Sequence, residues 1–218
     1  MIPLGDASRR PVNFPLVTTL IIVVNVFVFI CELMGGDEFV TNWSMIPADI
    51  VAGKHWITVL TSMFMHASWS HILANMVFLW AFGPEMEDIM GHMRYLVFYL
   101  VGGVVAMAAQ LLGDVHSTVP ALGASGAIAA VMGGFLVTYP RDQIRTLLIL
   151  GWFTRITFIP AALLIVLWFL LQLFSLGAVS DVQAGGVAYL AHIGGTIYGA
   201  ATARLFEGSK RIVATQNG

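Results

Sequence analysis

A serine and a histidine in two apolar stretches of this chain carry the side chains that acyl transfer requires. Ser125 lies in the motif Gly123-Ala124-Ser125-Gly126, and His192 precedes a run of small residues. In such a pair the imidazole takes the serine proton during attack on a carbonyl and returns it to the leaving amine. The two residues predict a Ser-His dyad if their helices approach within hydrogen-bond distance, about 2.6 to 3.2 Å.

Three donors are available for the oxyanion that this reaction forms. His71 and Asn75 are spaced i, i+4, so a helix places both side chains on one face. The backbone N–H of Ser125 is the third donor. His192 must be neutral to act as a base, and burial disfavours the imidazolium.

Other roles for these residues remain open on sequence alone. Serine and glycine pairs in apolar helices are commonly packing residues, and His71 with Asn75 could bond neighbouring helices. His66, His71 and His192 could bind a metal, but the spacing of His66 and His71 predicts different faces of a helix, and no HExxH motif occurs. We therefore predict no metal site, and no nucleotide or cofactor pattern is present.

The composition places these residues in a membrane protein. Hydrophobic residues make up 58% of the 218 residues and charged residues 10%, whereas an average soluble domain has about 25% charged residues. Uncharged stretches long enough to span a bilayer occur at 14–31, 61–82, 95–112, 117–139, 156–178 and 184–203. None contains an acidic third member for a triad. We predict one all-α domain over residues 1–218, a polytopic bundle of six transmembrane helices.

The basic residues alternate with these six spans. All lysines and arginines except Lys54 fall on one side of the arrangement: Arg9, Arg10, Arg94, Arg141, Arg145, Arg155, Arg204, Lys210 and Arg211. By the positive-inside rule, the N and C termini are cytoplasmic. The second, fourth and sixth spans then run inward, which puts the polar residues of these spans at similar depths in the outer half of the membrane.

Several connecting or polar segments have predictions of their own. The outer segment 32–60 contains two tryptophans and is expected to lie partly embedded at the interface. Residues 146–154 are apolar, but a helix of that length rises only about 13 Å, so we expect an interfacial loop. The acidic run Glu85, Glu87 and Asp88 is expected in a solvated cytoplasmic turn. Neighbouring helices or an interface are the expected partners of Asn25, Gln110 and Gln172.

Small residues set how closely the helices can approach. Gly195 and Gly199 form a GxxxG pair in the sixth span, and such surfaces let helix backbones come close in lipid. Close approach of the fourth and sixth spans would bring the Ser125 hydroxyl to the His192 imidazole.

Four segments of the chain, taken together, resemble the rhomboid intramembrane serine proteases. They are HASWSHILAN at 66–75, FGPEMEDIMG at 82–91, GASGAIAAVMG from Gly123 and AHIGGTIYG from Ala191. The similarity extends from Thr61 to Leu205, and the order of the segments also agrees with that family.

The resemblance implies a serine endopeptidase that cuts single-span membrane proteins near the outer ends of their helices. Ser125 would be the nucleophile and His192 the base, with His71, Asn75 and the Ser125 amide lining the oxyanion site. The structural and packing positions would be Gly123, Gly126, Glu87, Gly195 and Gly199. The segment 32–60 would be the membrane-embedded first loop, and the outer part of the fifth helix a lateral gate.

The chain departs from the family pattern at three positions. Ala129, four residues after the serine, stands where an aromatic residue often supports the histidine ring. Trp56 is followed by Ile57, where the family commonly has arginine. Ile89 lies two positions after Glu87, where the family often has a basic residue. The first departure bears on how firmly His192 is held.

The expected partners follow from these features. They are transmembrane substrates and the lipid bilayer, with no nucleic acid because no dense basic cluster occurs; the oligomeric state stays open. We expect a multi-pass protein of a bacterial or archaeal plasma membrane whose active site faces the extracytoplasmic side. The alternative is a catalytically inactive rhomboid-like protein that binds or escorts transmembrane helices.

Overall fold

A computed structural model of the protein describes residues 1–178 and 188–208. The predicted outer turn at 179–183, the first four residues of the predicted sixth span and the basic residues Lys210 and Arg211 lie outside these ranges. The described elements are β1 (Ile2–Asp6), α1 (Leu16–Trp43), α2 (Pro47–Val51), α3 (Thr58–Thr61), η1 (Ser62–Phe64), α4 (Trp69–Met90), α5 (His92–Gly113), α6 (Ser125–Thr138), β2 (Gln143–Leu150), β3 (Phe153–Pro160), α7 (Ala161–Ala178) and α8 (Tyr189–Phe206).

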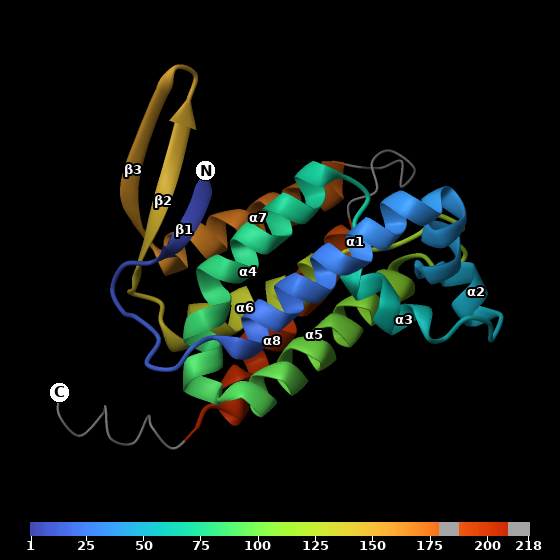
Figure 1. Cartoon of the computed structure of the whole chain (residues 1–218), viewed down its shortest axis with the longest axis horizontal. Coiled ribbons are helices and arrows are strands. Elements are labelled where there is room, and N and C mark those ends of the chain that lie inside the picture. The colour runs from blue at the N-terminus through green and yellow to red at the C-terminus, as the bar shows by residue number, and fades with distance from the viewer. Residues whose placement is uncertain (179–187, 209–218) are drawn as a thin grey trace.

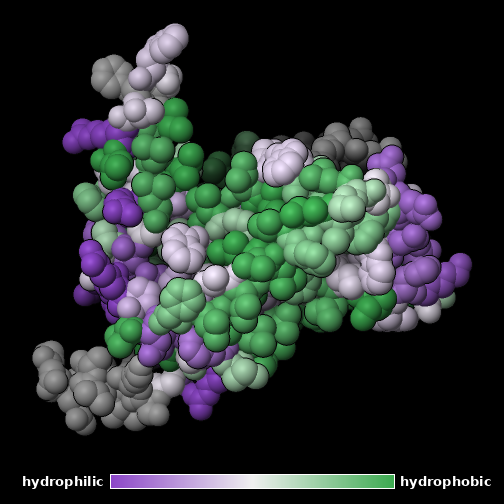
Figure 2. Space-filling model, viewed as in Figure 1, coloured by the Kyte–Doolittle hydropathy of each residue, from purple (hydrophilic) through white to green (hydrophobic). Residues whose placement is uncertain are grey.

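Helices α1, α4, α5, α6, α7 and α8 run side by side and form the body of the described part of the chain (Figure 1). The short helices α2 and α3 lie at one end of this body, and the three strands lie at the other end. Of the described helices, α1 and α5 are long and apolar enough to cross a membrane, while α6 and α7 are shorter apolar helices. On the face drawn in Figure 2, apolar side chains cover the middle of the helices and polar ones gather at the two ends. The prediction of a helical fold is thus confirmed in the main, but the three-stranded sheet shows that the fold is not all-α.

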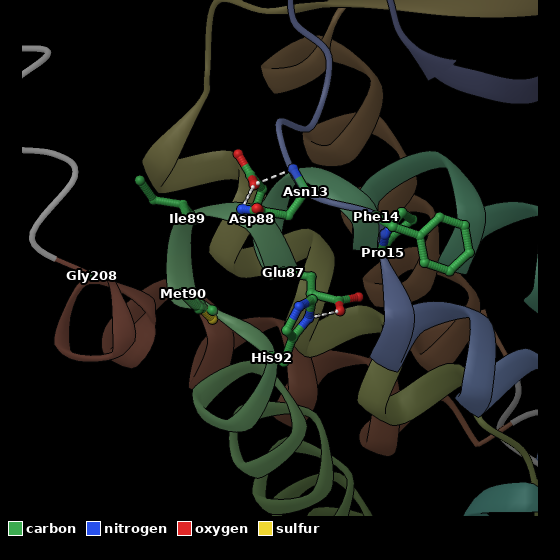
Figure 3. Close-up of a pocket in the computed structure, with 10 residues that line it drawn as sticks. Asn13, Phe14, Pro15, Glu87, Asp88, Ile89, Met90, His92 and Gly208 are labelled. Carbon is green, nitrogen blue, oxygen red and sulfur yellow. Dashed lines mark hydrogen bonds and ion pairs between the residues drawn. The ribbon is translucent and has the colours of Figure 1, made fainter.

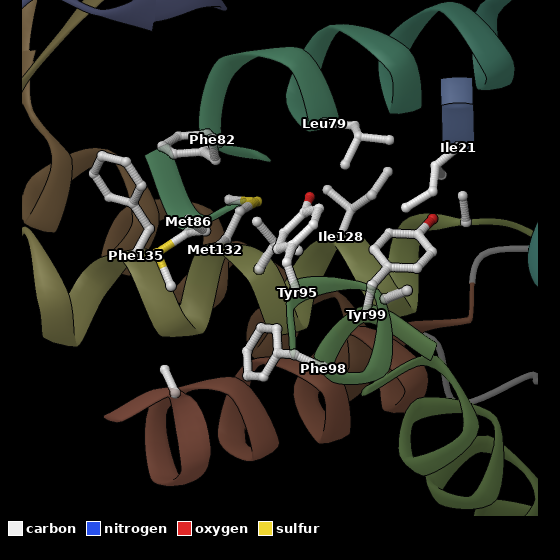
Figure 4. Close-up of a cluster of buried hydrophobic side chains, with 14 of the residues drawn as sticks. Ile21, Leu79, Phe82, Met86, Tyr95, Phe98, Tyr99, Ile128, Met132 and Phe135 are labelled. Carbon is white, nitrogen blue, oxygen red and sulfur yellow. The ribbon is translucent and has the colours of Figure 1, made fainter. Parts of the chain in front are cut away.

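Helix α6 lies inside the bundle. Every residue from Gly126 to Phe135 is buried, as expected for a helix that is apolar on all sides. In Figure 4, Ile128 and Met132 of α6 lie beside Tyr95 and Tyr99 of α5, and side chains of α4 close the cluster from the other side. The central helix is therefore held by its neighbours along its length.

Glycines bring α6 and α8 into direct backbone contact. A Cβ atom at Gly195 would overlap the carbonyl of Gly126, and one at Gly199 would overlap the carbonyl of Ala130. Gly126 itself packs against α5, where an added Cβ would lie 2.6 Å from Cβ of Ala106. The small residues of the two helices thus act as the sequence predicted, since no larger side chain fits at these positions.

The second long helix begins and ends later than predicted. The Ser68 side chain accepts a hydrogen bond from the backbone N–H of His71 and caps α4. At its other end α4 continues through Pro84 to Met90, so the acidic run is helical. The expectation of a solvated turn there is wrong, because Glu85 and Glu87 are buried.

Glu87 has a defined structural partner at the start of α1. Its carboxylate accepts hydrogen bonds from the backbone N–H groups of Val17 and Thr18, each 2.8 Å, and from the Thr18 hydroxyl at 2.7 Å. His92 contacts the same carboxylate at 2.5 Å (Figure 3). The first N–H groups of a helix lack intrahelical acceptors and favour negative charge, so Glu87 fixes the beginning of α1 to the end of α4.

The chain from 117 to 124 forms no regular helix, in contrast to the prediction. Met45 and Ala121 pair across a backbone bridge, and the N–H of Gly123 donates to the carbonyl of Ser62 at 2.9 Å. Gly123 has a φ of 131°, which a helix does not allow. Helix α6 therefore starts at Ser125.

Residues 146–154 belong to a β-hairpin, so the expected interfacial loop is a misassignment. Strands β2 and β3 pair antiparallel, and β1 pairs with β2 on the other side. The segments are rich in β-branched residues, which favour strands, and Gly151 turns the chain with a φ of 60°. Pro160 disfavours helix in the residue before it, so α7 begins at Ala161 and not at 156.

The outer segment 32–60 contains the second part of α1, which continues past the predicted end at Cys31. Gly36 interrupts this helix with a φ of 61° and a ψ of −154°. Glu32 is buried, and its two carboxylate oxygens lie 3.0 and 3.1 Å from the backbone nitrogen of His66. The rest of the segment forms α2 and most of α3, which pack at the end of the bundle where α4, α6 and α8 begin.

Candidate active site

Ser125 and His192 meet at the amino-terminal ends of two helices. Ser125 is the first residue of α6 and His192 lies in the first turn of α8. The Ser125 Oγ atom is 2.7 Å from Nε2 of His192. The backbone contact between α6 and α8 brings the two side chains together, as the pattern of small residues predicted.

Helix α7 supplies a second hydrogen bond to the histidine ring. Gln172 Oε1 lies 2.8 Å from Nδ1 of His192. The prediction that Gln172 bonds a neighbouring helix is confirmed, but the sequence did not indicate that its partner is His192. By contrast, Asn25 donates to the carbonyl of Ile21 in its own helix, at 2.7 Å.

An aromatic residue supports the His192 ring even though position 129 is alanine. The Trp168 ring of α7 lies 5.4 Å from the His192 ring, with an angle of 43° between their planes. Ala129 is fully buried in the tight contact with α8, where an added Cβ on Gly195 would lie 3.3 Å from it. Trp168 and Gln172 are one helical turn apart, so one face of α7 makes both contacts.

His71 and Gly123 border the space beside the Ser125 hydroxyl. A Cβ atom on Gly123 would lie 3.1 Å from Nε2 of His71 and 3.5 Å from Oγ of Ser125. The Ala67 N–H donates to Nδ1 of His71 at 3.4 Å, so a neutral His71 carries its proton on Nε2. That N–H faces the side of Ser125 that Gly123 leaves open.

Two further donors belong to the same region. The side-chain amide nitrogen of Asn75 is buried and has no hydrogen-bond partner, which is costly unless a ligand or water accepts from it. The N–H of Ser125 is at the first position of α6, where helices have no intrahelical acceptor. The three donors expected from the sequence therefore lie around one site.

His66 lies closer to His71 than the sequence indicated. The two rings are 5.2 Å apart in an edge-to-face arrangement. The expectation of different helix faces is wrong because His66 precedes α4 and is in the loop that leads into it.

A cavity of about 430 Å³ adjoins the serine. Its polar wall contains Ser125, His71, Asn75 and His192, and its apolar wall is formed by α4, α6 and α7. The apolar residues include Phe78, Ile128, Met132 and Trp168. An apolar segment that enters the cavity would lie next to the Ser125 hydroxyl.

Comparisons with known proteins match most of the chain to one family. The model of the rhomboid domain family matches residues 53–208. The chain is 30% identical over 126 residues to "Rhomboid protease GluP" of Bacillus subtilis, a match that covers 56% of this chain and 24% of that protein. It is 29% identical over 126 residues to "Rhomboid protein 1, mitochondrial" of Saccharomyces cerevisiae, covering 56% of this chain and 36% of the relative.

A human relative is similar over a shorter region. The chain is 34% identical over 88 residues to "Presenilin-associated rhomboid-like protein, mitochondrial", which covers 39% of this chain and 23% of the human protein. The chain thus matches between about a quarter and a third of the length of these relatives. The family match supports a membrane-embedded protein. The relatives include both bacterial and mitochondrial proteins, so they give no support to the expected bacterial or archaeal plasma membrane.

Proposed function

The chain belongs to the rhomboid family, and we propose that it is an intramembrane serine endopeptidase that cleaves single-span membrane proteins. The observation that carries the proposal is the 2.7 Å contact between Ser125 Oγ and His192 Nε2 beside the cavity. A serine that serves only in packing needs no histidine at this distance and no unpaired hydrogen-bond donor nearby. Ser125 has His192 at this distance, and the unpaired amide nitrogen of Asn75 belongs to a residue that lines the same cavity.

The proposed reaction begins with attack of Ser125 Oγ on the scissile carbonyl carbon. His192 Nε2 takes the hydroxyl proton during the attack and gives it to the leaving amine when the peptide bond breaks. Water then attacks the acyl-enzyme: His192 takes a proton from this water and gives it to Ser125 Oγ as the ester bond breaks. At the end of the cycle, Ser125 and His192 have their starting protonation states.

The negative charge on the tetrahedral intermediate needs donors that are in place before the reaction. We assign this role to the N–H of Ser125, Nε2–H of His71 and the amide of Asn75. The buried, unpartnered amide nitrogen of Asn75 supports the assignment. Fixed donors in a site of low polarity stabilise an oxyanion more strongly than water does.

Six helices in one domain, α1 and α4 to α8, form the proposed membrane-spanning part. Basic side chains bond at one end of it: Arg204 donates to the carbonyl of Val137, and Arg94 donates to the carbonyl of Glu207. Lys54 follows α2 at the opposite end. With the basic end on the cytoplasmic side, both termini are cytoplasmic and the dyad faces the extracytoplasmic side.

Cleavage of a model substrate tests the proposal. The purified protein in liposomes is mixed with a generic single-span substrate, and the wild type is compared with Ser125→Ala and His192→Ala. We expect the wild type to cut the substrate and both variants to be inactive while retaining wild-type thermal unfolding. A fluorophosphonate probe should label the wild type and leave Ser125→Ala unlabelled.

The alternative function gives a different pattern. A helix-binding escort would retain single-span proteins in pull-down experiments without cutting them, and the probe would not react with it. If several single-span substrates stay uncut and the wild type stays unlabelled, the protease proposal is wrong.

A further inference from the structure

We infer that Gln172 of α7 is a positioning residue for the base, so that the site is a Ser125–His192–Gln172 triad and not a dyad. This inference rests on the proposed function, which requires His192 Nε2 to accept the serine proton. It adds the residue that keeps Nε2 free for that task. None of the six predicted spans contains an acidic residue that could fill this position.

The first step of the argument is the chemistry of the two ring nitrogens. A neutral imidazole carries one proton, and the other nitrogen is the acceptor. The amide oxygen of Gln172 accepts but cannot donate, so the 2.8 Å contact places the proton on Nδ1 of His192. Nε2 is then the unprotonated nitrogen, and it faces the Ser125 hydroxyl.

The second step is the orientation of the Gln172 amide. Its nitrogen lies 3.5 Å from the carbonyl oxygen of Trp168, one turn earlier in α7. That carbonyl can only accept, so it favours the NH₂ group on its own side and leaves the oxygen for His192. If the amide were flipped, its oxygen would face the Trp168 carbonyl oxygen, and both atoms are acceptors. Its NH₂ group would face the Nδ1–H of His192, and both groups are donors.

The third step is the position of the ring as a whole. Trp168 covers the His192 ring, and Gln172 holds Nδ1. Both come from α7, so this helix takes over the support that an aromatic residue at position 129 would give. Among the described residues that line the cavity, the other titratable side chain is His71 of α4.

The inference makes α7 part of the catalytic arrangement as well as part of the wall of the cavity. Trp168 lines the cavity and also covers the His192 ring, so this helix contacts both the cavity and the proposed base.

Two substitutions at 172 test the role directly. Gln172→Leu keeps a similar volume but removes the acceptor, and we expect kcat to fall about 10- to 100-fold with a nearly unchanged KM. Gln172→Glu keeps the acceptor and adds a negative charge that favours the imidazolium. We expect it to retain activity and to move the acidic limb of the kcat/KM profile upward by about one pH unit or more.

The controls separate this role from simple packing. Leu171→Ala changes an exposed side chain on the same turn of α7 and should leave kcat and the pH profile at wild-type values. Thermal unfolding of each variant shows that it is folded. If Gln172→Leu keeps wild-type kcat, or Gln172→Glu leaves the acidic limb in place, Gln172 does not position the base.

A spectroscopic measurement does not depend on activity. In protein labelled with ¹⁵N-histidine, we expect the neutral His192 signal of the wild type to be that of an Nδ1–H tautomer, identified by its loss in His192→Gln. An Nε2–H tautomer in the wild type would overturn the inference even if cleavage is normal. The expected tautomer in a protein that cuts no substrate would instead leave the triad standing and reject the protease proposal.

Discussion

Gly123 allows the side chains of Ser125 and His71 to share a small space. Its φ of 131° belongs to a region that residues with side chains rarely adopt. A Cβ atom there would also lie 3.0 Å from the ring of His71. Gly123 thus precedes the start of α6 at Ser125 and leaves open the space between the His71 ring and the Ser125 hydroxyl.

Asn75 offers the clearest test of the oxyanion assignment. Asn75→Leu keeps the approximate volume and removes the unpartnered donor, so we expect kcat to fall about 100- to 1,000-fold with little change in KM. Steady-state cleavage in liposomes measures both constants.

The matched control for this change is Leu73→Ala, which alters an exposed residue on the other face of α4. It should leave kcat unchanged. Wild-type kcat in a folded Asn75→Leu protein would remove Asn75 from the oxyanion site.

At the scale of elements, Glu87 joins two helices that are distant in sequence. Its carboxylate binds the first N–H groups of α1 while its own backbone belongs to the last turns of α4. This explains why an acidic side chain is buried near the end of an apolar helix: the helix terminus supplies the donors and the favourable potential.

Removal of this carboxylate should lower the stability of the folded protein and should not act directly on the cleavage reaction. Glu87→Leu leaves the N–H groups of Val17 and Thr18 without their acceptor, and we expect a loss of about 2 kcal/mol or more of stability. Thermal unfolding in detergent measures it.

Asp88→Asn serves as the control on the next residue, because Asn keeps the oxygen that accepts from Asn13. Its effect should stay within about 0.5 kcal/mol. Equal stability of Glu87→Leu and the wild type would contradict the capping role.

The whole molecule has one polar end with basic residues and another with the candidate site. Cys31 is the single cysteine, so a Cys31→Ser background accepts new cysteines as reporters. In intact cells, a membrane-impermeant maleimide should label Lys54→Cys. It should label Arg141→Cys only after permeabilisation.

Both reporter positions are exposed in the structure, so burial does not explain a difference between them. Labelling of Arg141→Cys and not Lys54→Cys in intact cells would reverse the proposed orientation. Labelling of both from the same side would reject an arrangement with three spans between them.

The sequence by itself determined the mainly helical class and the similarity to a family, and it singled out Ser125 and His192, which the structure places 2.7 Å apart. Long apolar stretches have few structural alternatives, since lipid requires internal backbone hydrogen bonds. Polar residues within them are costly, so Ser125 and His192 stand out. Small residues at 195 and 199 similarly predicted the close contact of α6 and α8.

The tertiary structure alone decided the rest, because it depends on partners far away in sequence. Glu87 looked solvated until the start of α1 supplied its donors, and the hairpin at 143–160 needed strand β1 as a neighbour. Gln172 looked like any interhelical amide. Only the packing of α7 against α8 puts its oxygen on Nδ1 of His192, and no local pattern encodes which partner a single amide will meet.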